Sequence, residues 1–136
     1  MSTRDLSIKS IRLDFISDAI KSEMSSDEYF QNSVLRPIIK FQNDLLIAAF
    51  LNFCTTYKNV FFELSVENKI SYIENAFVKD RTFRNSLKDM IVGLFTVEEY
   101  TVYSPNASAL NKRIIGIVKE RLISHVQLLS EMGPTA

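Results

Sequence analysis

Cysteine, histidine, glycine and proline are scarce in this chain of 136 residues. It contains one cysteine, one histidine, three glycines and three prolines. A single cysteine excludes a disulfide within the chain, and zinc sites draw on several cysteines and histidines. Sheet proteins need more turn residues than this, so the composition favours helices.

Sequence motifs for catalysis are missing as well. The chain has no Gly-x-Ser-x-Gly elbow, no glycine-rich phosphate loop and no Glu-x-x-His pair of the kind found in di-iron bundles. His125 is the single imidazole available as a base. We therefore expect no metal, no other cofactor and a function without catalysis.

Charge and hydropathy restrict the partners. Sixteen basic and sixteen acidic side chains give a formal net charge of zero. A general polyanion binder is basic, so nucleic acid is not an expected partner unless a local basic patch binds it. Residues 1–24 hold no uninterrupted apolar run of a signal peptide, and no run reaches the roughly 20 residues of a membrane span. We expect a cytoplasmic protein that binds no membrane.

The most apolar stretch indicates the centre of the fold. From Leu45 to Cys54 every residue is apolar except Asn52. A helix that is apolar on all sides is usually surrounded by its own protein, so we predict a buried core helix over about 37–57. Cys54 is then a small buried apolar group. Pro37 predicts a break before this helix rather than a kink.

Capping residues and apolar spacing predict the remaining helices. Ser25, Ser65 and Asp80 each precede a run with apolar residues at helical spacing. Thr96 and Glu99 match a capping box that opens a short helix. Ser104 then reads as the N-cap of a long C-terminal helix over about 105–130.

These elements predict an all-α fold, a single-domain bundle of five to six helices over residues 25–132. Residues 1–10 are polar and lack a period, and residues 11–24 fit either a short helix or an extended arm. We expect residues 1–24 to form an N-terminal tail or arm that is partly mobile.

A seven-residue repeat on the predicted C-terminal helix places polar groups in an apolar stripe. The stripe contains Asn111, Val118, His125 and Met132. One interpretation is a partly buried histidine with a hydrogen bond inside the bundle. Another is a homodimer in which this helix packs against its copy, with Asn111, Val118 and His125 at the interface. A catalytic or ligand-binding role for His125 is the third.

Two sets of residues are candidates for binding small molecules. Arg36 and Lys40 begin the predicted core helix, and Tyr100 and Tyr103 could add donors to the same cleft. The second set is a basic cluster, which is either a solvated face or an anion-binding patch. It consists of Lys79, Arg81, Arg84 and Lys88.

Residues 97–113 also fit a helix-turn-helix reading. In it the segment from Asn106 to Arg113 would face DNA bases and phosphates. The turn at residues 104–106 lacks the usual glycine, and the apolar positions of the short helix do not suit the motif. For these reasons DNA binding is only an alternative interpretation.

The segments RPIIKFQNDLL, SYIENAF, DRTFRNSLKDMIVG, FTVEEY and SALNKR resemble a family of small, uncharacterised, all-helical bacterial proteins. The resemblance covers about residues 25–129. Members are often labelled glyoxalase, although no known motif supports that label. True βαβββ glyoxalases hold a metal with histidine and glutamate, and this chain has one histidine. The resemblance therefore implies no site residues.

Taken together, the sequence favours a non-catalytic module for binding and self-association, most simply a homodimer. A small-molecule enzyme or binder, as the glyoxalase label suggests, is the first alternative. DNA binding through residues 97–113 is the second.

Overall fold

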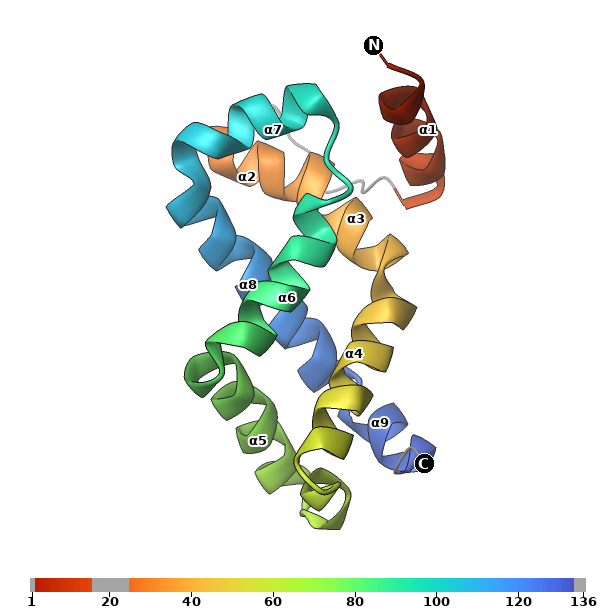
Figure 1. The fold of residues 1–136 in the computed structure, drawn as a ribbon, viewed down its shortest axis with the longest axis vertical. Helices are drawn as coiled ribbons and strands as arrows, with labels where there is room; N and C mark the ends of the chain where they lie inside the picture. The colour runs from red at the N-terminus through yellow and green to blue at the C-terminus, as the bar shows by residue number, and fades with distance from the viewer. Residues whose placement is uncertain (1, 16–24, 134–136) are drawn as a thin grey trace. The chain divides into compact units, whose positions relative to one another are not determined.

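The computed structural model describes residues 2–15 and 25–133, and over these residues it is helical and contains no strand (Figure 1). The all-α prediction is confirmed. The helices are α1 (Thr3–Arg12), α2 (Ser26–Phe30), α3 (Arg36–Phe41), α4 (Asn43–Thr56), α5 (Val66–Lys79), α6 (Arg81–Val92), α7 (Val97–Tyr103), α8 (Ala107–Ser124) and α9 (Val126–Met132).

The chain divides into two compact units. Unit 1 combines Met1–Gln42 with Lys88–Ile114, and unit 2 combines Asn43–Leu87 with Ile115–Ala136. The predicted domain boundaries at residues 25 and 132 stay a prediction. Of the helices described, none is both long and apolar enough to span a lipid bilayer.

Local capping chemistry sets several helix starts where the sequence predicts them. The Ser25 hydroxyl accepts from the Glu28 amide, and the Ser65 hydroxyl accepts from the Asn68 amide. Thr96 opens α7 with a complete capping box to Glu99. Each cap satisfies a backbone N–H that has no partner within its own helix.

The predicted break at Pro37 is wrong. The chain stays helical from Ser26 to Phe41, with a π-helical segment at Gln31–Leu35 directly before α3. The wider i→i−5 pattern shifts the carbonyls ahead of Pro37, which relieves the clash and the missing donor that a proline brings to an α-helix. The interruption comes instead at Gln42, whose φ is −86° and ψ 4°, and α4 begins after it.

The core helix is also less enclosed than predicted. Phe50 and Cys54 on α4 are fully buried, but Leu45 is 47% exposed and Asn52 faces solvent. The helix therefore has one open side. Since that side carries Leu45 and alanine as well as Asn52, its composition does not reveal the exposure.

Residues 3–12, expected to be an aperiodic tail, form helix α1. Ser2 caps it by accepting from the Asp5 amide. The buried residues are Asp5, Ile8 and Arg12, which lie on one helical face. The spacing of apolar residues does not reveal this buried face, because two of its three residues are charged. Leu13–Phe15 continue as a 3₁₀ turn, and the expectation for residues 16–24 lies outside the described residues.

The predicted long C-terminal helix is in fact two helices. Ser104 does not cap a new helix but enters a 3₁₀ turn at Ser104–Asn106, after which α8 begins. At the other end, His125 leaves the helical conformation with φ −99° and ψ 11°, and α9 follows it. The imidazole Nδ1 of His125 lies 2.7 Å from the Arg121 carbonyl oxygen. Side chains that bond a helical carbonyl compete with the backbone and favour such a break.

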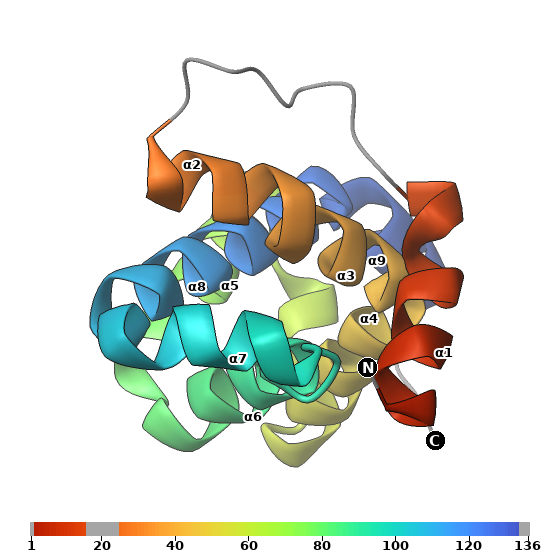
Figure 2. The same ribbon diagram turned by 90° about the horizontal axis from the view of Figure 1, so that it is seen from above.

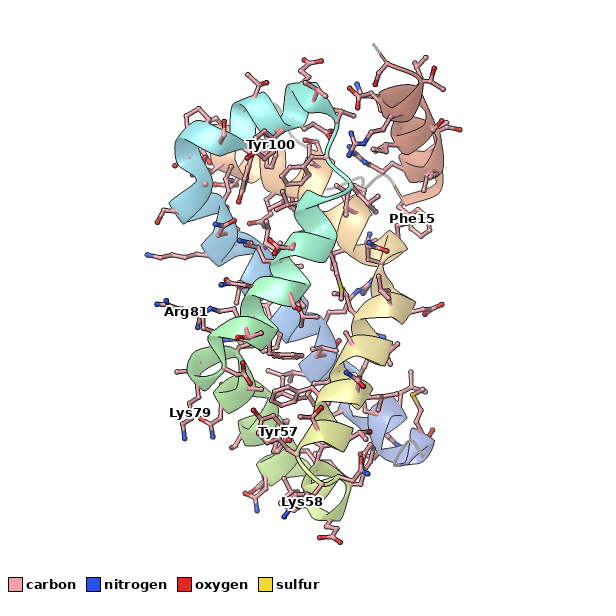
Figure 3. The ribbon with its side chains drawn as sticks, viewed as in Figure 1. Phe15, Tyr57, Lys58, Lys79, Arg81 and Tyr100 are labelled. Carbon is pink, nitrogen blue, oxygen red and sulfur yellow. The ribbon has the colours of Figure 1, made fainter. Side chains whose placement is uncertain are left out.

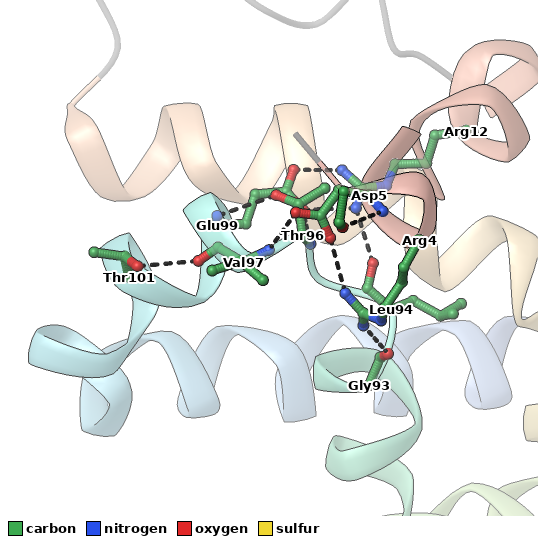
Figure 4. A network of polar contacts seen from close by, with 10 residues as sticks. Arg4, Asp5, Arg12, Gly93, Leu94, Thr96, Val97, Glu99 and Thr101 are labelled. Atoms are coloured by element: carbon green, nitrogen blue, oxygen red, sulfur yellow. Dashed lines mark hydrogen bonds and ion pairs between the residues drawn. The ribbon is translucent and has the colours of Figure 1, made fainter. Parts of the chain in front are cut away.

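In unit 1, α1 packs on α3 (Figure 2) and its charged side chains reach the loop between α6 and α7 (Figure 4). Arg12 makes a bidentate ion pair with Glu99, and its Nη2 also donates to the Leu94 carbonyl at 2.9 Å. Asp5 Oδ2 accepts from the Val97 amide at 3.1 Å, and Arg4 donates to the Gly93 carbonyl at 2.9 Å. Helix α1 thus satisfies backbone groups at the end of α6 and at the start of α7.

In unit 2, aromatic rings form the core. Phe50 and Phe61 are fully buried with ring centroids 5.1 Å apart. Phe53 lies 4.3 Å from Phe83, and Tyr72 lies 5.4 Å from Phe61. Edge-on and tilted pairs at these separations add stabilisation beyond the area that they bury.

Candidate binding groove

An open groove of about 480 Å³ lies in unit 2 along α4, the segment after it, and α5. Its apolar wall contains Phe53, Tyr57, Val60, Tyr72 and Ala76. A volume of this size is in the range of known small-molecule sites, which span roughly 300–1,000 Å³. A second cavity, in unit 1, measures only about 10 Å³ and holds no more than a water molecule.

Helical spacing and one tight turn build the groove. Phe53 and Tyr57 are four residues apart, so both side chains lie on one face at the end of α4. Lys58 and Asn59 then adopt left-handed conformations with φ of 63° and 58°, which reverse the chain. Left-handed backbone costs energy for a lysine, so tertiary packing maintains this turn.

The rings of the aromatic wall contact one another. Phe53 lies 4.7 Å from Tyr57 and 6.2 Å from Tyr72, measured between ring centroids. Burial raises the pKa of Tyr72 to about 12, with smaller contributions from Cys54 and Tyr57, so its phenol is neutral at pH 7. The wall is therefore an apolar surface with a fixed shape, which suits a flat apolar group.

Asp80 forms one edge of the groove and is held in place by internal hydrogen bonds. Its Oδ1 accepts from the Phe83 amide and caps α6, and its Oδ2 accepts from the Tyr57 hydroxyl, each at 3.0 Å. The backbone hydrogen bond from Phe83, followed by that from Tyr57, lowers the pKa of Asp80. The same contact raises the pKa of Tyr57.

The remaining polar groups at the rim are the Asn75 amide and the Lys79 ammonium, which together offer mainly donors. Asn75 and Lys79 both line the groove from α5, are exposed, and make no hydrogen bond or ion pair with any described residue. Figure 3 labels Lys79 together with Tyr57. They are four residues apart, so they lie one turn apart on the same face. The groove therefore combines an apolar wall with a free amide and a free ammonium group.

Cys54 lies beside this region but is not a nucleophile. It is fully buried, and burial raises the pKa of its thiol to about 12. The reactive form of cysteine is the thiolate, which is negligible at neutral pH with such a pKa. This agrees with the prediction of a small buried apolar group.

The four residues of the predicted basic cluster differ in their contacts. Arg84 Nη1 donates to the Phe77 carbonyl at 2.9 Å near the end of α5, and Lys88 pairs with Asp89 at 3.3 Å. Arg81 is exposed. Lys79 alone of the four lines the groove.

The predicted cleft residues do not line either cavity described above. Arg36 donates to Asn32 one helical turn away, and Lys40 is exposed. Tyr103 is buried and its hydroxyl donates to Asn111 Oδ1, whereas Tyr100 is exposed. Tyr100 and Tyr103 do lie together, with ring centroids 5.7 Å apart.

The predicted dimer stripe does not lie along one continuous helix, because α8 ends before His125. Val118 is fully buried within the single chain, and Asn111 accepts from Tyr103. His125 is half-buried with its Nδ1 at the Arg121 carbonyl, in agreement with the first interpretation of this residue. The homodimer itself stays a prediction that needs another surface.

Two of the side chains that the helix-turn-helix interpretation places against DNA make contacts within the chain instead. Asn106 donates to Asp27 at 2.8 Å, and Arg113 donates to Gln31 at 2.9 Å. Ser108 and Lys112 are exposed. DNA binding through residues 97–113 would rest on few free donors.

The groove has no distinct signature in the sequence. Phe53 belongs to the predicted core helix, and Tyr72 belongs to the predicted helix that follows Ser65. The available signal was the spacing of Tyr72, Ala76 and Lys79, which places an aromatic, a small residue and a cation along one face of α5. Within the described residues no three His, Cys, Asp or Glu side chains are placed to hold a metal ion. Comparisons with protein-family models, curated proteins and solved structures find no match.

Proposed function

We propose that this protein is a non-catalytic binding module that holds a small molecule with an apolar body in the groove of unit 2. The observation that carries the proposal is the groove of about 480 Å³ with an aromatic wall formed by Phe53, Tyr57 and Tyr72. Apolar clefts with a few polar groups at the edge are the usual form of small-molecule sites.

The polar groups of the groove support binding rather than bond cleavage. The Asp80 carboxylate already accepts two hydrogen bonds, and its pKa is lowered, so it is a poor general base at neutral pH. The phenol of Tyr72 has a pKa of about 12 and is a poor acid. Catalytic acids and bases work best with a pKa near the working pH.

A groove-filling variant tests this proposal. Asn75→Trp places a large ring at the exposed rim, and Glu74→Trp places the same ring on an exposed position of α5 outside the groove. We expect 1-naphthylacetamide and 1-naphthylacetate to perturb backbone NMR signals around residues 53–80. Asn75→Trp should weaken this binding at least about tenfold and Glu74→Trp should not.

If neither naphthalene probe perturbs signals around the groove at millimolar concentration, the proposal is wrong. It is equally wrong if both tryptophan variants weaken binding to the same extent, because the probe would then sit elsewhere on the chain.

Self-association is the second element of this proposal, and the cytoplasm is the proposed location. Exposed apolar side chains on α1, the 3₁₀ turn after it and α7 offer surfaces other than the stripe around His125, and they include Leu6, Leu13, Val97 and Tyr100. Analytical ultracentrifugation at micromolar concentration distinguishes a dimer from a monomer, and a monomer would remove this element.

A further inference from the structure

We propose that the ligand of the groove in unit 2 is an organic carboxylate, with its apolar body on the aromatic wall and its carboxylate between Asn75 and Lys79. This inference rests on the proposed function and names the chemical class that the groove takes. The feature that decides the class is the set of hydrogen-bonding groups left free at the rim.

The free rim groups on α5 offer mainly donors, and the one acceptor among them is the Asn75 amide oxygen. The Asn75 amide and the Lys79 ammonium have no partner among the described residues, and a lysine ammonium only donates. The Tyr57 hydroxyl already donates its proton to Asp80. A ligand that pairs with the Lys79 ammonium must therefore supply an acceptor, and a carboxylate supplies two oxygens with about four acceptor positions, enough for the Asn75 N–H groups as well.

The groups that would favour a cation are already occupied. Among the described residues, Asp80 is the one carboxylate that lines the groove, and both of its oxygens accept hydrogen bonds from the protein. A bound cation would have to compete with the Tyr57 hydroxyl and with the cap of α6. An anion at Lys79 disturbs neither contact.

The charge at the end of α5 also favours an anion. The last carbonyls of a helix carry partial negative charge, which would repel a carboxylate near Lys79. In this chain the Arg84 guanidinium donates to the Phe77 carbonyl at 2.9 Å and so offsets that charge. Arg84 does not line the groove, but it lowers the negative charge of the helix end beside Lys79.

The size of the groove limits the ligand to a small molecule. A volume of about 480 Å³ accommodates a ring system or a medium-length alkyl chain rather than a folded partner. The wall of Phe53, Tyr57 and Tyr72 suits a flat ring.

A matched pair of probes tests the charge preference at constant shape. We would measure dissociation constants of 1-naphthylacetate and 1-naphthylacetamide at pH 7 by NMR titration of the full chain. The acid should bind about tenfold tighter than the amide, since a hydrogen bond from an ammonium to a carboxylate is roughly twice as strong as one between neutral groups. Its affinity should fall with added salt, whereas that of the amide should not.

Two charge variants locate the effect. Lys79→Gln removes the charge and keeps a donor at the rim, and Arg81→Gln removes a charge from an exposed residue that does not line the groove. Lys79→Gln should bring the acid and the amide to similar affinity. Arg81→Gln should keep most of the preference.

Each outcome decides between the two proposals. Equal binding of acid and amide to the natural chain overturns the carboxylate inference and leaves the binding function standing. No binding of either probe overturns the binding function. A preference for the acid that survives Lys79→Gln overturns the assignment of the carboxylate to Lys79.

Discussion

Each of the two units of this chain is stabilised internally by a different kind of interaction. In unit 1, charged side chains of α1 pair with Glu99 and with backbone groups of the loop between α6 and α7. In unit 2, aromatic rings around Phe50 and Phe61 form the core. Polar contacts require exact partners and respond to pH, whereas ring packing depends on shape. The aromatic unit is also the one with an open groove.

Truncation of the aromatic core should have the largest effect. Phe50 is fully buried and has ring contacts with four aromatic residues, namely Phe53, Phe61, Tyr72 and Phe83. Phe50→Ala should lower the free energy of unfolding by about 3–5 kcal/mol, since it creates a cavity. Urea denaturation measures this loss. Leu45→Ala, at an exposed position of the same helix, is the control and should cost less than about 1 kcal/mol.

Removal of one ionic partner should have the next largest effect. Arg12→Met leaves Glu99 partly buried without its cation, which should cost about 2–4 kcal/mol. Hydrogen exchange should show lost protection in α1 and at the start of α7. The double variant Arg12→Met with Glu99→Gln should recover part of the loss, because no unpaired charge then remains. Additive losses in the double variant would mean that the pair is not coupled.

The smallest effects should appear in the dependence of stability on pH, with opposite signs in the two units. Burial alone would raise the pKa of Glu99, but hydrogen bonds from Arg12 and Thr96 hold it below the ordinary value of 4.5. Its contribution is therefore present above about pH 4.5 and is lost as the pH falls through the lower folded pKa. Burial raises the pKa of Cys54 from 9.0 to about 12. Its contribution is present below pH 9.0 and is lost as the pH rises toward 12.

Denaturation midpoints measured from acid to alkaline pH test this contrast. Glu99→Gln should reduce the loss of stability in acid and leave the alkaline loss unchanged. Cys54→Ala should do the reverse, although the raised pKa of Tyr72 keeps part of the alkaline loss. If Glu99→Gln changed the alkaline limb instead, the assignment of the acid limb to the ion pair of unit 1 would be incorrect.

Interactions between residues close in sequence were predictable. The caps at Ser25, Ser65 and Thr96 depend on a side chain and an amide three residues later, so the sequence contains both partners. The buried apolar faces of α4 and α5 follow in the same way from helical spacing, through residues such as Phe50 and Phe77.

Interactions between distant residues were not predictable. Asp5 and Arg12 read as solvent-exposed charges until α1 meets the loop at residues 93–97, more than 80 positions away. The helix break at His125 depends on a side chain competing for a backbone carbonyl, which apolar spacing does not record. The groove needs Phe53 and Tyr72 from two different helices.

The sequence by itself therefore determined the helical class and most helix starts, because spacing and capping act within a few residues. Only the tertiary structure decided that a polar N-terminal segment is a helix, that Arg84 caps α5, and that Lys79 and Asn75 remain free beside an aromatic wall. The physical reason is that a charged side chain has the same local signal whether it pairs inside the protein or faces solvent. Its role depends on the partner that folding brings to it.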